Sequence, residues 1–163
     1  MKAVKIRRKS LFCLLCVAFV WHFLLPHQAY AEMSVAFHYG QNPPVKLLQG
    51  YDWAVVEPGH LPRPPHTGKT SWFAYLSLGE ISVDRPYAKD VPPAWKLGRN
   101  VAWNSSIMDQ AAADWPDFVV KRMVQPLWDA GYRGFFLDTL DSWQAVAKNE
   151  TDRQKQVAGL ART

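Results

Sequence analysis

Three short apolar segments that each end on a carboxylate constrain the fold of this chain more than any other feature. Runs of aromatic and aliphatic residues of this length, bounded by glycine and proline, are typical of strands buried on both faces. None of the three shows a clear apolar–polar alternation, and loop or helical sequence separates them. This order predicts an α/β fold with a parallel sheet. The segments are Trp53–Glu57, Trp72–Glu80 and Gly134–Asp138.

Turn and cap signals predict the other elements. Asp114 is a favourable N-cap for a helix over Trp115–Asp129, in which Pro126 should bend the last turn. The segment Ile81–Gly98 contains three prolines, and we expect a long functional loop there. Further elements are expected at Ser34–Gly40 (strand), Val45–Gln49 (helix), Asn100–Asn104 (extended) and Gln144–Leu160 (helix).

The first 31 residues predict a secretory signal peptide. Five lysines and arginines precede an apolar stretch over Leu11–Leu25, and Ala29-Tyr30-Ala31 has the pattern of a cleavage site. An uncleaved membrane anchor is the alternative, but the apolar stretch is short, contains His22 and ends at Pro26. We therefore expect a periplasmic or secreted domain over residues 32–163, with no stable membrane span after cleavage.

Removal of this segment changes the partners that the composition supports. The chain carries 19 Lys+Arg and 14 Asp+Glu, and all five basic residues of the leader would be lost, so the mature part is neutral. A nucleic-acid partner is therefore not indicated. Both cysteines also lie in the leader. With only His38, His60 and His66 left, and no phosphate loop or dinucleotide fingerprint, we predict no metal site and no cofactor.

The acids at the strand ends suggest a reaction. In a parallel barrel the carboxyl ends of the strands converge on one face, which would gather Glu57, Glu80 and Asp138. Hydrolysis of a glycosidic bond needs one carboxyl group as proton donor and a second as nucleophile or base. Close carboxylates also raise the pKa of at least one of them, as a general acid requires. The alternative is that each acid pairs with an arginine or caps a helix.

Two motifs resemble the signature strands of glycoside hydrolase family 114. They are Tyr-Leu-Ser-Leu-Gly-Glu at residues 75–80 and Gly-Phe-Phe-Leu-Asp-Thr-Leu-Asp-Ser at residues 134–142. The similarity extends over residues 34–160. It implies a TIM (β/α)8 barrel, of which this chain supplies the first half. It also implies endo-α-1,4-polygalactosaminidase activity, the internal cleavage of a cationic polymer of galactosamine and N-acetylgalactosamine.

The resemblance also implies roles for individual residues. By position, Asp138 matches the catalytic-site acid of the Leu-Asp-Thr motif, and Glu80 matches the acid of the Gly-Glu motif. Glu57 and Asp141 would bind substrate, since their charge suits protonated amino sugars. Tyr39, at the tip of the first strand, would contact sugar.

Chain length leaves the function open in one respect. A TIM barrel contains about 250 residues, and the resemblance places a further catalytic glutamate on a later strand. We therefore expect this polysaccharide hydrolase domain to be incomplete and to have little activity alone. One alternative is a non-catalytic carbohydrate-binding or assembly module that works with exopolysaccharide export machinery. Another is a fragment that does not fold.

Overall fold

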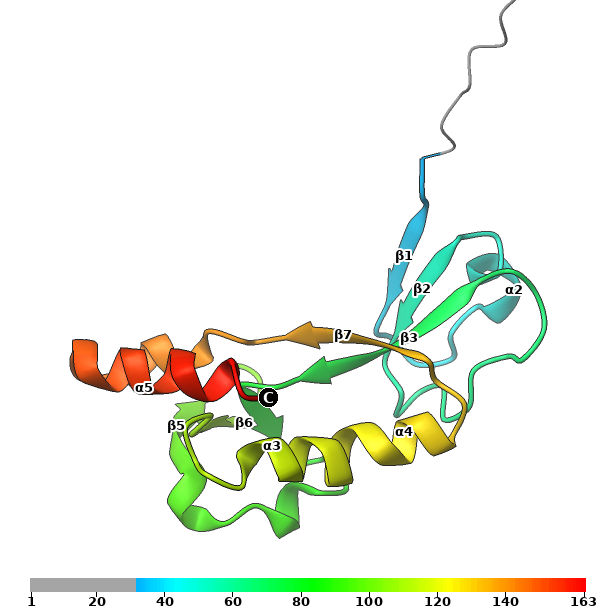
Figure 1. Ribbon diagram of the computed structural model, residues 1–163. Coiled ribbons are helices and arrows are strands. Elements are labelled where there is room, and N and C mark those ends of the chain that lie inside the picture. Colours follow the sequence, from blue (N-terminus) through cyan, green and yellow to red (C-terminus); the bar gives the residue numbers. More distant parts are fainter. Residues whose placement is uncertain (1–31) are drawn as a thin grey trace, which may run out of the picture. The chain divides into compact units, whose positions relative to one another are not determined.

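A computed structural model describes residues 32–163 (Figure 1). The predicted signal peptide, residues 1–31, lies outside the described residues. Within residues 32–163, none of the helices has the length and apolar character needed to cross a membrane.

Four parallel strands form the main sheet, in the order β1-β2-β3-β7. The strands are β1 Val35–His38, β2 Trp53–Val56, β3 Ser71–Ser77 and β7 Gly134–Asp138. Each pairs with its neighbours in parallel register, and Ser77 of β3 lies opposite Asp138 of β7. The short helix α2, Val45–Leu48, connects β1 to β2. The predicted α/β fold with parallel strands is therefore confirmed.

A second, antiparallel sheet includes the two ends of the segment for which we expected a loop. It contains β4 Glu80–Ser82, β5 Lys96–Asn100 and β6 Ser105–Met108, in the order β4-β6-β5. Two 3₁₀ helices, η1 Ala88–Asp90 and η2 Pro93–Trp95, lie between β4 and β5. The loop prediction for Ile81–Gly98 is therefore confirmed for residues 83–95, which contain all three prolines and no strand, and was wrong at its two ends, which belong to β4 and β5. Asn100–Asn104 is only partly extended: residues after Asn100 form the β5–β6 turn.

The helix predicted over Trp115–Asp129 exists, but its hydrogen bonding changes along its length. It consists of α3 Trp115–Phe118, a π-helical segment Val119–Val124, and α4 Gln125–Asp129. Pro126 has no N–H to donate, and its ring crowds the preceding turn. A wider π turn relieves this crowding, so the irregularity lies before the proline rather than in the last turn. Figure 1 shows this helix running beside β3 and β7.

The C-terminal segment forms two helices. The 3₁₀ helix η4, Ser142–Ala145, follows β7, and α5 spans Glu150–Leu160. The side chain of Asn149 caps α5 by accepting a hydrogen bond from the amide of Asp152 at 2.9 Å. The helix predicted over Gln144–Leu160 is therefore confirmed for its second part only.

The two faces of the parallel sheet differ in burial. One face packs into a core of Leu48, Ala54, Val56, Trp72, Ala74 and Tyr132. The other face carries aromatic rings that remain partly exposed: Phe37, Tyr39, Trp53, Phe73, Tyr75 and Phe136. Strand β3 therefore alternates between buried and half-buried residues, which corrects our interpretation of the strands as uniformly buried. The second face corresponds to the lumen of a barrel.

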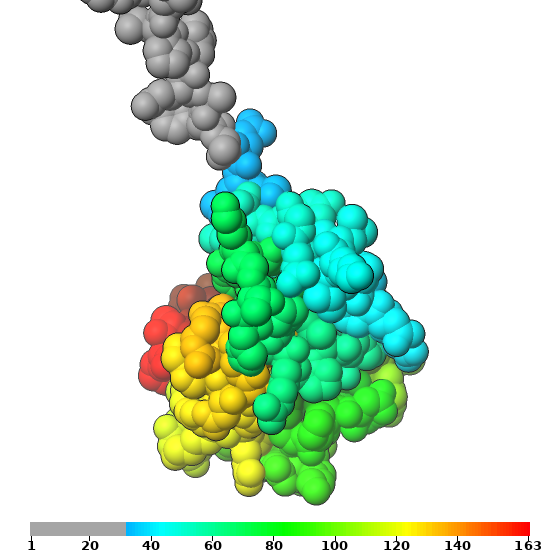
Figure 2. Space-filling model, turned by 90° about the vertical axis from the view of Figure 1, so that its right-hand side faces the viewer, coloured from blue at the N-terminus to red at the C-terminus, as the bar shows by residue number. Residues whose placement is uncertain are grey.

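The proline-rich segment between β2 and β3 covers the amino-terminal end of the sheet. The carbonyl of Thr67 accepts a hydrogen bond from Gln49 at 3.4 Å, and the carbonyl of Leu61 accepts one from the Tyr132 hydroxyl at 2.6 Å. In Figure 2 this blue-green segment lies between the cyan α2 region and the yellow α4 region. The opposite, carboxyl end of the sheet is free to carry the candidate site.

Candidate active site

Asp138 is the last residue of β7 and is exposed. Its Oδ2 accepts a hydrogen bond from the Tyr75 hydroxyl at 2.6 Å, and its Oδ1 accepts one from the amide of Thr139 at 2.7 Å. Burial, then the hydrogen bond to Asp138 and its charge, raise the pKa of Tyr75. The phenol therefore stays protonated at neutral pH and serves as a donor. Both donors fix the direction of the carboxylate.

The two motifs cross next to Asp138, where Thr139 of one motif contacts Gly79 of the other and has a strained backbone. Thr139 has φ +58°, a left-handed conformation that β-branched residues rarely adopt. Its hydroxyl accepts a hydrogen bond from the amide of Gly79 at 3.0 Å and lies 2.7 Å from the hydroxyl of Ser77. A Cβ on Gly79 would come within 1.9 Å of the Thr139 carbonyl oxygen. Only glycine allows this approach, and backbone strain of this kind concentrates at functional sites.

Glu80 does not end a parallel strand, as its position in the sequence suggested. Strand β3 stops at Ser77, and Glu80 is the first residue of the antiparallel strand β4. Its side chain is buried, and the residue is only 7% exposed. It accepts hydrogen bonds from Asn100 at 3.1 Å, from Ser142 at 2.8 Å and from Ser105. Glu80 therefore joins β4, the β5–β6 hairpin and the segment that follows Asp138.

The surroundings of Glu80 keep it ionised. Burial alone would raise the pKa of Glu80, and so does the charge of Asp138, but the hydrogen bonds from Ser105, Asn100 and Ser142 outweigh both and lower it. A general acid needs the opposite shift. These contacts suit a carboxylate that organises the site.

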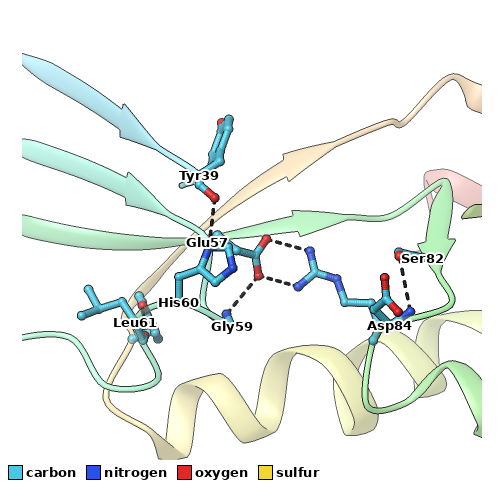
Figure 3. A network of polar contacts seen from close by, with 9 residues as sticks. Tyr39, Glu57, Gly59, His60, Leu61, Ser82 and Asp84 are labelled. Carbon is cyan, nitrogen blue, oxygen red and sulfur yellow. Dashed lines mark hydrogen bonds and ion pairs between the residues drawn. The ribbon is translucent and has the colours of Figure 1, made fainter. Parts of the chain in front are cut away.

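Glu57 follows β2 and lies in an ion pair. The Arg85 guanidinium contacts both of its carboxylate oxygens, at 2.8 Å for Nη2 to Oε2, and the amide of Gly59 donates to Oε1 at 3.0 Å (Figure 3). Burial would raise the pKa of Glu57, but the hydrogen bonds from Arg85 and Gly59 and the charges of Arg85 and His60 lower it. Glu57 therefore follows the alternative given from the sequence, in which an acid pairs with an arginine.

Tyr39 and Asp141 lie at the same carboxyl end. The ring of Tyr39 packs 4.8 Å from that of Tyr75, and its carbonyl accepts a hydrogen bond from His60 Nδ1 at 3.0 Å. Burial and then the charge of Asp138 raise the pKa of Tyr39, which indicates that the two side chains are near each other. Asp141 is exposed and precedes η4.

Among residues 32–163, no group of three or more His, Cys, Asp or Glu side chains is arranged to hold a metal ion.

Several side chains of the site were not identified from the sequence. Tyr75 and Thr139 lie inside the two motifs that contain the acids, so their place in these motifs could have signalled a role. Ser105 and Asn100 carry no such signal, because antiparallel pairing of β4 with β6 and of β6 with β5 brings them to Glu80.

The chain belongs to glycoside hydrolase family GH114, whose family model matches residues 26–163. A solved structure supports the same placement: the glycoside hydrolase domain of PelA from Pseudomonas aeruginosa is 38% identical, with a TM-score of 0.63. The alignment covers 79% of this chain and 54% of that domain. A variant of that domain with one glutamate replaced by alanine matches with a TM-score of 0.62 and the same identity and coverage.

A fungal structure shares the fold. Aspergillus fumigatus Ega3, solved in complex with galactosamine, is 12% identical with a TM-score of 0.53, over 80% of this chain and 53% of that one. The chain thus spans about half the length of the structures that it matches, and its sheet is the first half of their TIM barrel. No curated protein matches the chain significantly.

Proposed function

We propose that this chain supplies the first half of an endo-acting glycoside hydrolase that cleaves a cationic, galactosamine-containing exopolysaccharide. The observation that carries the proposal is Asp138, an exposed carboxylate at the end of a parallel strand, oriented by Tyr75 and by the strained residue Thr139. Membership of GH114 and the similarity to the PelA hydrolase domain support the reaction class. The galactosamine named in the Ega3 structure supports the sugar.

In this proposal Asp138 acts directly on the substrate. A carboxyl group held by two fixed donors suits a nucleophile, or a base that activates water, at the anomeric carbon. Glu80 belongs to the catalytic site through its hydrogen bonds, which hold the segment after Asp138 in place. The proton donor must be a carboxyl group with a raised pKa, a shift that neither Glu57 nor Glu80 has. We therefore propose that residues 32–163 alone have little or no activity.

Substrate binding falls to residues around Asp138. Glu57, Asp141 and Tyr39 lie at the carboxyl ends of the strands, and the carboxylates would attract protonated amino groups of the polymer. The Arg85 pair reduces the net negative charge of Glu57, so Asp141 would contribute more.

The leader sets the location in this proposal. Residues 1–31 would act as a signal peptide, and the domain from residue 32 to residue 163 would work in the periplasm or outside the cell.

A second candidate is a non-catalytic carbohydrate-binding module of an exopolysaccharide export system. The observation that favours it is the engagement of Glu57 and Glu80 in hydrogen bonds that lower the pKa of both carboxyl groups, the opposite of what a proton donor needs.

Cleavage of an α-1,4-linked galactosamine polymer tests the hydrolase directly. The protein would be a chimera in which this chain replaces the matching half of the PelA hydrolase domain, and the readout would be new reducing ends. We expect Asp138→Asn to abolish cleavage, while Asp117→Asn, which alters an exposed helical ion pair with Lys121, leaves it unchanged. Normal cleavage by the Asp138→Asn chimera would refute the role of Asp138. Polymer binding with no cleavage by the unsubstituted chimera would favour the second candidate.

A further inference from the structure

The turn between β5 and β6 presents two apolar side chains to solvent. Trp103 is 75% exposed and Val101 is 82% exposed, more than any other large hydrophobic residue described. Among residues 32–163, no other aromatic ring packs against Trp103. Exposure of this degree is unusual for tryptophan, which is mostly buried on average.

The conformation of this turn is fixed by its own contacts. Asn104 adopts φ +49°, a left-handed conformation that asparagine tolerates. Its amide donates to the carbonyl of Val101 at 3.3 Å, and its side-chain oxygen accepts a hydrogen bond from the Arg99 guanidinium. These contacts close the turn, and the side chain of Trp103 is exposed to solvent on it.

Glu80 connects this turn to the candidate active site. The residues that flank the turn, Asn100 and Ser105, both donate to the Glu80 carboxylate. Ser142, four residues after Asp138, donates to the same carboxylate. Trp103 is three residues from Asn100, so its backbone lies within about 10 Å of that anchor at a strand rise of about 3.4 Å per residue. One buried carboxylate thus ties both ends of the turn that carries Trp103 to the segment that follows Asp138.

We propose that Trp103 forms a substrate-binding subsite that takes a protonated amino sugar of the polymer. The inference rests on the proposed function and names the group that would bind beside the reacting sugar. An ammonium group over the face of a tryptophan is attracted by the negative potential of the ring. The acids at the strand ends attract the same cationic polymer. A neutral N-acetylated sugar lacks the charge, so Trp103 distinguishes the two.

Calorimetric titration of the whole chain with an α-1,4-linked galactosamine oligosaccharide tests the subsite. At an exposed cation–π contact we expect Trp103→Ala to weaken binding about two- to fivefold and Trp103→Phe to weaken it less. Trp128→Ala is the matched control, because the Arg133 guanidinium already covers that ring at 4.4 Å. Since Trp103 is exposed, its variants should keep the melting temperature of the unsubstituted chain.

The outcomes separate this inference from the function on which it rests. Weaker binding in Trp103→Ala alone, with no comparable loss for the N-acetylated oligosaccharide, supports the subsite. Unchanged affinity in Trp103→Ala, or equal losses in Trp103→Ala and Trp128→Ala, refutes it while the proposed function stands. No binding of the oligosaccharide by the unsubstituted chain overturns both.

Discussion

Replacement of Gly79 by alanine should be among the most damaging single changes in this domain. The added Cβ would lie 1.9 Å from the Thr139 carbonyl oxygen and 2.9 Å from Gln110 Nε2. The first contact is with backbone, so a side chain cannot rotate away to relieve it. Either the β3–β4 connection or the segment after Asp138 must move by about 1 Å or more, since real Cβ contacts begin near 3 Å.

The free energy of unfolding should fall because the added methyl group overpacks a site that is already filled. Such insertions cost about 1–3 kcal/mol, and occasionally more, and the backbone contact places Gly79→Ala at the upper end. For a domain of this size, about 3 kcal/mol corresponds to a fall of about 10 °C in the melting temperature. Thermal unfolding followed by circular dichroism would measure the fall. Movement of Thr139 would also disturb Asp138, so we expect loss of cleavage in the chimera.

Gly40→Ala is the matched control. The nearest atoms to a Cβ at that position belong to the His38 side chain, at 3.4 and 3.5 Å, so the change should be neutral or slightly stabilising. Equal melting temperatures for Gly79→Ala and the unsubstituted chain would refute the close crossing of the two motifs.

Three further changes have distinct expected outcomes. Thr139→Val keeps the shape but removes the acceptor of the Gly79 amide, and urea unfolding should show a loss of about 1–2 kcal/mol; an unchanged midpoint would argue against that hydrogen bond. Glu80→Gln should cost about 1–3 kcal/mol in the same assay, since it weakens three hydrogen bonds to a charged group; full stability would contradict its connecting role. The Glu57 carboxyl, paired with Arg85, has a pKa below its ordinary value of 4.5, so the unfolded chain binds more protons than the native one, and stability should fall as pH drops through and below about 4.5. Glu57→Gln should flatten this dependence, and an unchanged pH profile would count against the pair.

Local sequence patterns were sufficient to predict the parallel strands. The aromatic and aliphatic runs of β2, β3 and β7 have no competing helical period, and glycine or proline marks their ends. Asp138 was placed correctly at a strand end for the same reason. The start of the helix after Asp114 was also predictable from its first-turn proline, although the Asp114 side chain makes no capping hydrogen bond.

The surroundings of Glu80 could not be predicted in this way. An uninterrupted apolar run suggested one long strand to Glu80, but the chain crosses Thr139 at Gly79 and enters another sheet. The strands of that sheet are short, and a segment with three prolines and two 3₁₀ helices separates β4 from β5. The pairing of β4 with β6 joins residues about 25 positions apart, which a local pattern does not encode.

The pairing of Glu57 with Arg85 could not be predicted from local sequence either. Its position after β2 predicted an acid at the carboxyl end of that strand, and Glu57 directly follows β2. Its partner Arg85 comes from a segment 28 residues later. Sequence spacing alone therefore left open whether Glu57 faces a substrate or an arginine.

An NMR titration of the chain with an α-1,4-linked galactosamine oligosaccharide tests the proposed site most directly, because it does not require a complete catalytic pair. The proposed function predicts saturable shift changes at the amides of Tyr39 and Thr139, and the Trp103 subsite predicts a further change at the indole N–H of Trp103. It predicts none along Trp115–Asp129. No shift changes, or changes confined to that helix, would contradict a sugar site at the carboxyl ends of the parallel strands.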